Sequence, residues 1–244
     1  MKSEKRVMNI AHKGASGTFP GNTLLAFEKA LEMGADMLEI DLRISKDGEV
    51  IVFHDEQVQM GNTGKRAIAA LTISEIKTVE LGMDQHIATF KEVLCQFRDR
   101  CMFYIDLKTK TALADVLVVL QEEQCIDRAI LGVSDPVLLE KVRILNDRLR
   151  VSLLVSLQKK DTIFALGREF KPDFLHPCWE DYRKAAPSSL LTKEFFQEAH
   201  EHGFGIVTWH EEHEEELERL ASLPVYGICT DTPDRLSRIL KKNR

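Results

Sequence analysis

Short runs that are apolar at nearly every position recur along the chain and alternate with amphipathic stretches. Such runs are typical of parallel strands that are buried on both faces. Eight strands are predicted, at Val7–Ala11, Asp36–Leu42, Met102–Leu107, Ala129–Val133, Leu149–Val155, Asp173–His176, Phe204–Thr208 and Tyr226–Thr230. The alternation of these strands with helical patterns predicts an α/β fold.

Helices are predicted between most of the strands because apolar residues recur there at helical spacing. In the first, Asn22 or Thr23 is the candidate N-cap, and the residues spaced for one apolar face are Leu24, Leu25, Phe27, Ala30 and Leu31. The others are expected near Lys110–Gln124, Pro136–Asn146, Thr162–Glu169, Ser188–His202, His213–Ser222 and Pro233–Lys242. Strict alternation over eight strands favours one closed (β/α)₈ TIM barrel spanning residues 1–244. A doubly wound sheet of six strands is the structural alternative.

The alternation is interrupted once, by an insertion at about residues 45–98, after the second predicted strand. It contains a hairpin turn signal at Asp47-Gly48, a short apolar run at Val50–Phe53, and two short helical patterns near Thr72–Val79 and Thr89–Phe97. A long excursion from the carboxyl end of a barrel strand is usually functional, because these loops build the site of such a fold.

Composition narrows the class of protein. The chain has 244 residues, of which 44% are hydrophobic and 30% charged, and its net charge of −6 comes from interspersed residues of both signs. This charge balance argues against a nucleic-acid partner and against stable membrane association. The N-terminal stretch lacks the apolar core of a signal peptide, and five cysteines without a C-x-x-C pair favour buried reduced thiols, so a cytoplasmic protein is expected. The oligomeric state stays open.

Polar residues gather at the carboxyl ends of several apolar runs. In a barrel these ends converge on one mouth, where catalytic groups come from different strands. The clusters are His12-Lys13, Glu39 with Asp41, His54-Asp55, and Asp106 with Lys108. Taken singly, each has a structural explanation, such as a surface histidine or an ion pair between strands. Together they predict one polar site at the mouth.

The residue types in these clusters are complementary. Glu39 and Asp41 lie two apart on a strand and point the same way, and Asp106 adds a third carboxylate. Three hard oxygen ligands suit one divalent ion, Mg²⁺ or Ca²⁺, better than zinc. His12 and His54 could then divide general acid and general base roles.

Other polar residues are given structural interpretations. His86, His202 and His213 are interpreted as surface residues, and the acidic run from Glu211 to Glu218 is interpreted as a solvated helix face. Lys13 and Lys108, by contrast, adjoin the predicted polar site and are interpreted as functional. If the site acts on a phosphoryl group, their positive charge would lie where that group accumulates negative charge.

At this point the sequence resembles a known family, the glycerophosphodiester phosphodiesterases. The resemblance runs from about residue 8 to residue 240, and its ordered N-terminal segments are highly specific. The segments that carry it are Ile10–Gly17, Pro20–Thr23, Gly34–Asp41, Ser45–Gly48, Val52–Asp55 and Gly227–Pro233.

The resemblance implies a (β/α)₈ barrel that hydrolyses a glycerophosphodiester, such as glycerophosphocholine or glycerophosphoethanolamine, to glycerol 3-phosphate and an alcohol. Carried over by position, it assigns acid/base catalysis to His12 and His54, a divalent metal to Glu39, Asp41 and Asp106, and phosphate or substrate contact to Lys13, Lys108 and Trp209.

The chain departs from the family pattern at several positions. Lys13 replaces the usual Arg and keeps the charge without its bidentate geometry, Gly21 replaces the usual Glu, and Asp106 stands where Glu is more common. The stretch Val207–His210 stands where Trp-Thr-Val-Asn is usual. Two alternatives therefore remain: a phospholipase D-like enzyme acting on a lysophospholipid, and a non-catalytic barrel that binds a phosphodiester, which Gly21 would favour.

Overall fold

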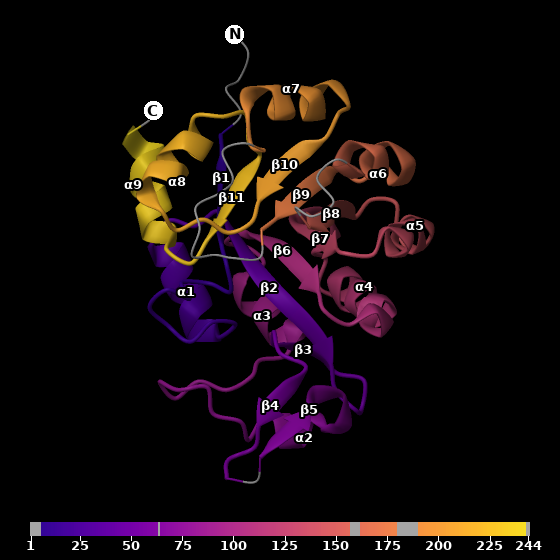
Figure 1. Cartoon of the computed structure of the whole chain (residues 1–244). Coiled ribbons are helices and arrows are strands. Elements are labelled where there is room, and N and C mark those ends of the chain that lie inside the picture. The colour runs from indigo at the N-terminus through magenta and orange to yellow at the C-terminus, as the bar shows by residue number, and fades with distance from the viewer. Residues whose placement is uncertain (1–5, 63, 157–161, 180–189, 243–244) are drawn as a thin grey trace.

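The computed structural model describes residues 6–62, 64–156, 162–179 and 190–242. Within these ranges eight parallel strands close into a barrel, because β1 pairs with β2 on one side and with β11 on the other (Figure 1). The barrel strands, in order around the ring, are β1 (Met8–Ala11), β2 (Met37–Ile44), β6 (Met102–Leu107), β7 (Ala129–Val133), β8 (Arg150–Ser156), β9 (Phe174–Cys178), β10 (Gly205–Thr208) and β11 (Gly227–Thr230). The predicted TIM barrel is confirmed, and the six-strand doubly wound alternative is wrong.

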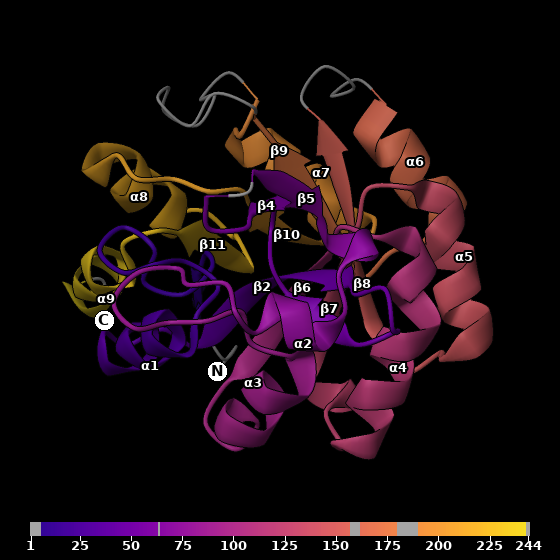
Figure 2. The same cartoon turned by 90° about the horizontal axis from the view of Figure 1, so that it is seen from below.

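Helices surround the ring of strands (Figure 2). They are α1 (Leu24–Glu32), α3 (Phe90–Phe97), α4 (Leu113–Glu122), α5 (Pro136–Leu145), α6 (Ile163–Phe170), α7 (Lys193–Glu201), α8 (Glu214–Ala221) and α9 (Pro233–Lys242), with short 3₁₀ turns at Ile68–Ala70, Lys110–Ala112 and Ile126–Arg128. The hydroxyl of Thr23 caps α1 by accepting a hydrogen bond from the backbone N–H of Ala26, so Thr23 and not Asn22 is the N-cap. Residues 188 and 189 of the helix predicted at Ser188–His202 lie outside the described residues.

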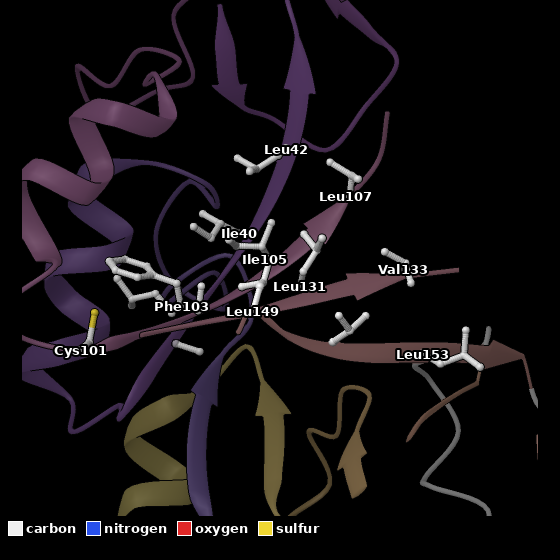
Figure 3. Packing of buried hydrophobic residues seen from close by; sticks show 14 of the residues in the cluster. Ile40, Leu42, Cys101, Phe103, Ile105, Leu107, Leu131, Val133, Leu149 and Leu153 are labelled. Carbon is white, nitrogen blue, oxygen red and sulfur yellow. The ribbon is translucent and has the colours of Figure 1, made fainter. Parts of the chain in front are cut away.

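Alternation along each strand separates two apolar layers. Ile40, Phe103 and Ile105 point outward and pack in the large core between the strands and the helices (Figure 3). Tyr104, on the opposite face of β6, belongs to a second cluster with Ile10, Met37, Ile130, Phe174, Val207 and Cys229, which fills the barrel. Because neighbours in a strand point to opposite faces, Glu39, Asp41 and Asp106 share the inward face with Tyr104.

The insertion after β2 has a core of its own. Strand β3 (Val50–Val52) pairs antiparallel with β2 through the predicted turn, in which Gly48 has a φ of +87°. Beyond it lie a hairpin of β4 (Gln57–Gln59) and β5 (Lys65–Ala67), and the short helix α2 (Ile73–Ile76). Their buried side chains form a separate cluster, namely Ile51, Val58, Ile68, Leu71, Ile76, Val79 and Ile87. The insertion is thus a small folded unit that the barrel carries beside its mouth.

Two further observations concern the cysteines and the membrane. All five cysteines are free, and Cys101, Cys125 and Cys229 are buried, but Cys95 is exposed, so the expectation of uniformly buried thiols is wrong there. In the part of the chain that the structure describes, no helix has the length and apolar character needed to cross a membrane.

Candidate active site

Three carboxylates meet at the carboxyl end of the barrel. Asp41 and Asp106 are register partners on the neighbouring strands β2 and β6, and Glu39 lies one inward position below Asp41. One carboxylate oxygen from each of the three residues lies within 4.8 Å of the other two. Glu39 and Asp41 are fully buried and Asp106 nearly so. Like charges this close are costly unless a cation compensates them.

Nearby groups satisfy part of this cluster. The backbone N–H of Lys13 donates to Glu39 Oε2 at 2.8 Å, and the Asn22 amide donates to Asp41 Oδ2 at 2.7 Å. The Lys108 ammonium lies 2.7 Å from Asp106 Oδ2 and 3.1 Å from Asp41 Oδ1. Glu39 Oε1 is buried without a hydrogen-bond partner in the described structure. Glu39 Oε1 can therefore accept a further donor or ligand.

The charges set opposite pKa shifts within the cluster. Burial and the adjacent Asp41 raise the pKa of Glu39 to about 8. Burial also acts to raise the pKa of Asp41, but Lys108 and Lys13 outweigh it and lower that pKa. The nearby lysines therefore compensate the negative charge of Asp41 but not that of Glu39.

His12 is held in one orientation at the end of β1. Its Nδ1 lies 2.6 Å from Asp231 Oδ1, just beyond β11, and its ring stacks on His210 with centroids 4.5 Å apart. Burial lowers the pKa of His12, but the Asp231 hydrogen bond and the Glu39 charge outweigh it, so the net pKa is raised. Nε2 has no hydrogen-bond partner among the described residues. With Nδ1 occupied by a carboxylate, Nε2 is the nitrogen left for chemistry.

Asp231 is itself fixed from several sides. The Ser16 hydroxyl donates to Asp231 Oδ1 at 2.7 Å, and the backbone N–H of Asp231 donates to Glu212. Glu212 also accepts from the hydroxyls of Thr230 and Thr232, at 2.9 and 2.7 Å. The carboxylate that orients His12 is therefore part of a hydrogen-bonded corner between β10 and β11.

His54 lies on the other side of the mouth, two residues beyond β3. Its Nδ1 lies 2.7 Å from Asp55 Oδ1, and its backbone carbonyl accepts from Arg43 Nε at 2.8 Å. The side chain is 45% exposed, against 7% for His12. Burial leaves the net pKa of Asp106 raised, but the charge of His54 acts to lower the pKa of Asp106 and contributes to the lowered pKa of Asp41. The two predicted histidines thus border the same carboxylate cluster.

The remaining predicted site residues also lie at this end of the barrel. Lys13 Nζ is 3.9 Å from Asp41 Oδ2, and its ammonium is partly exposed. The Trp209 ring packs edge-on against His12, with centroids 4.9 Å apart, and is half-buried. All eight residues singled out in the sequence are therefore gathered around one mouth.

Comparison with known proteins identifies the family. The sequence model of the glycerophosphoryl diester phosphodiesterase family matches residues 12–235. This chain belongs to that family. A glycerophosphodiester phosphodiesterase from Caldanaerobacter subterraneus subsp. tengcongensis is 25% identical over 97% of this chain and 99% of its own length.

Solved structures of phosphodiesterases share the fold. A glycerophosphodiester phosphodiesterase from Thermotoga maritima has a TM-score of 0.79 and 27% identity, covering 96% of this chain and 98% of the other. A phosphodiesterase from Oleispira antarctica, solved with the product sn-glycerol-3-phosphate, has a TM-score of 0.82 and 19% identity, covering 95% and 96%.

Sequence reasoning missed several polar residues that the structure places around this mouth. Asp231 follows an apolar strand, as the predicted clusters do, so the same signal could have identified it. Asn22 was interpreted only as a possible cap, whereas its amide holds Asp41. The interpretation of Glu211–Glu218 as a solvated helix face is wrong for its start. Glu211 is buried and accepts from the backbone N–H of Glu212 and His213, and α8 begins only at Glu214. His86, His202 and His213 are exposed, as expected.

Proposed function

We propose that this member of the family hydrolyses glycerophosphodiesters to glycerol 3-phosphate and an alcohol, with the aid of a divalent metal ion. The observation that carries the proposal is the set of three converging carboxylates bordered by two histidines and two lysines at one barrel mouth. The Caldanaerobacter relative, which is named as a glycerophosphodiester phosphodiesterase and matches this chain over 99% of its own length, supports the substrate class.

The carboxylate cluster fits a divalent ion. Oxygens within 4.8 Å of one another can share one ion, since Mg²⁺ and Ca²⁺ bind oxygens at about 2.0–2.6 Å. Glu39 Oε1 is a buried acceptor without a hydrogen-bond partner among the described residues, and a bound cation would satisfy it. Glu39, Asp41 and Asp106 would hold the ion, and a bound ion would polarise the phosphoryl oxygens as a Lewis acid.

The protein's own groups supply the proton transfers and the charge. Nε2 of His12 and the exposed ring of His54 flank the site, so one would take the proton of the attacking nucleophile while the other protonates the leaving alkoxide. The nucleophile would be either water or the neighbouring glycerol hydroxyl, and in the second case water would then open the resulting cyclic phosphate. Lys13 and Lys108 would stabilise the negative charge that grows on the phosphoryl oxygens. The Trp209 ring would pack beside the glycerol or alcohol part of the substrate, next to His12.

The deciding experiment offers glycerophosphocholine with Mg²⁺, and separately with Ca²⁺, and measures the glycerol 3-phosphate released. We expect turnover with at least one ion, its loss in excess EDTA, and its return when the ion is restored. A lysophospholipid offered in parallel tests the alternative substrate class. Full activity in excess EDTA would exclude the metal role, and binding without product would mean a non-catalytic barrel.

A further inference from the structure

Exposed apolar side chains are concentrated on the outer face of α5. Across the described ranges, the large hydrophobic side chains classed as exposed are Met83, Val118, Val137, Ile144 and Leu145. Three of them lie on α5 and one on the neighbouring α4, and Ile144 is 83% exposed. Single exposed apolar residues are ordinary, whereas a contiguous group marks an interaction surface. Helix α5 lies at the outer edge of the molecule, where a partner can reach it (Figures 1 and 2).

A groove between α4 and α5 extends this surface. Its walls include Leu113 and Ala114 of α4, and Val137, Leu138 and Leu145 of α5. The ion pair between Lys110 and Asp135, at 2.7 Å, stands beside the amino-terminal ends of the two helices. The apolar face of α5 and the groove therefore form one continuous surface.

The face of α5 complements itself when a second copy runs in the opposite direction. If the two-fold axis passes between Glu140 and Lys141, Val137 lies opposite Ile144 of the copy, and Glu140 lies opposite Lys141 of the copy. Glu140 and Lys141 each lie three or four residues from Val137 and from Ile144, so the four positions share one face of the helix. An apolar contact and an opposite-charge pair then each occur twice, as two-fold symmetry requires.

The two charged residues at the centre of this face are available for such a pair. Neither Glu140 nor Lys141 forms an ion pair within the described part of the chain, and Lys141 acts on Asp135 only through longer-range charge. Arg143, on another face of the helix, is by contrast occupied by Asp173 at 2.8 Å.

We propose that α5 is the interface of a symmetric dimer, in which α5 of a second copy lies antiparallel across it and covers the groove. Ile144 then moves from an exposed position to the edge of the partner's groove, at Val137. This interface is independent of the phosphodiesterase proposal, because none of its residues belongs to the carboxylate and histidine site.

The first test compares Ile144→Glu with the wild-type protein by sedimentation over a range of concentrations. We expect a wild-type dimer and a dissociation constant raised about tenfold or more in the variant, because each dimer loses two apolar contacts. Met83→Glu introduces the same charge at an exposed apolar residue of the insertion and should leave the dimer unchanged. Thermal melting checks that both variants fold. A wild-type protein that stays monomeric at every concentration would overturn the proposal.

The second test exploits the charge pattern. Glu140→Lys places lysine against lysine twice, and Lys141→Glu places glutamate against glutamate twice, so each variant alone should dissociate. Mixed together, they restore two opposite-charge pairs, and a heterodimer should form. Failure of the mixture to associate, while each single variant is monomeric, would refute the proposed register.

Discussion

The two histidines of the site are held by different parts of the molecule. His12 stands on the barrel itself, where β1 meets β11, and is buried between Asp231, His210 and Trp209. His54 stands on the insertion, with its ring exposed, and the carboxylate that it pairs with in the described structure, Asp55, is at the next position in the chain. One imidazole is preorganised by the core of the fold, and the other is free to adjust to a substrate.

The largest expected effect tests whether both histidines act in chemistry. His12→Ala and His54→Ala should each lower kcat by about 10²–10⁴-fold, because general acid and general base catalysis contribute that much each. His202→Ala, at the exposed histidine that caps the C-terminus of α7, is the control and should leave kcat unchanged. Near-normal turnover in either site variant would remove that histidine from the mechanism.

Replacing the carboxylate partner of each histidine should lower kcat by different amounts. Asp231→Asn should lower kcat by about tenfold or more with little change in KM, because the amide no longer fixes the tautomer and orientation of His12. Asp55→Asn should change kcat less than about threefold, since its 70% exposed side chain makes a solvated pair with His54. Ser16→Ala removes the other side-chain donor to Asp231 and controls for local disturbance. Equal losses in the two Asn variants would contradict the difference in preorganisation.

The pH dependence of stability should show the His12–Asp231 pair directly. The pKa of His12 is higher in the folded protein than its unfolded value of 6.5, so the protonated imidazole stabilises the fold below pH 6.5. This stabilisation is lost as the pH rises through the pKa of the folded state. Burial acts to raise the pKa of Asp231, but the His12 hydrogen bond outweighs it and lowers that pKa from 3.8 to about 2. The ionised carboxylate therefore stabilises the fold above pH 3.8, and this stabilisation is lost as the pH falls toward 2. The pair therefore stabilises most between pH 3.8 and 6.5.

Asp231→Asn should accordingly reduce the free energy of unfolding by on the order of 1 kcal/mol more near pH 5 than near pH 9. Urea unfolding of the wild type and the variant at both values measures the difference. A loss that is the same at the two pH values would mean that the pair contributes no ionic stabilisation. Asp55→Asn should show little pH-dependent loss, because its side chain is largely exposed.

Much of the barrel and of its mouth could be predicted because both follow from local patterns. Apolar runs fix the strands, and parallel strands bring their carboxyl ends together whatever the sequence of the loops. Residues such as Glu39 and Asp41, which lie toward the carboxyl end of the predicted strand Asp36–Leu42, were therefore identified. The roles assigned to them remain predictions until the variants are measured.

Other features depend on contacts that no local pattern reveals. Asn22 has a φ of 60° that turns its amide toward Asp41, while Thr23 takes the helix cap. Gly21 shows a similar dependence: a Cβ there would lie 3.1 Å from Lys13 Cβ, so the absence of a side chain makes room for the lysine. The acidic run after β10 was misinterpreted because a charged stretch gives the same pattern in a helix and in a buried corner.

The closure of the barrel has a consequence for how the protein matures. Asp231 reaches His12 across 219 residues of sequence, and only the pairing of the last strand with the first brings them together. A nascent chain that has emerged as far as α7 already contains every carboxylate of the cluster and both imidazoles, yet it lacks the group that aligns one of them. Turnover should therefore begin abruptly, when the final strand docks, which makes enzymatic activity a sensitive reporter of completed folding.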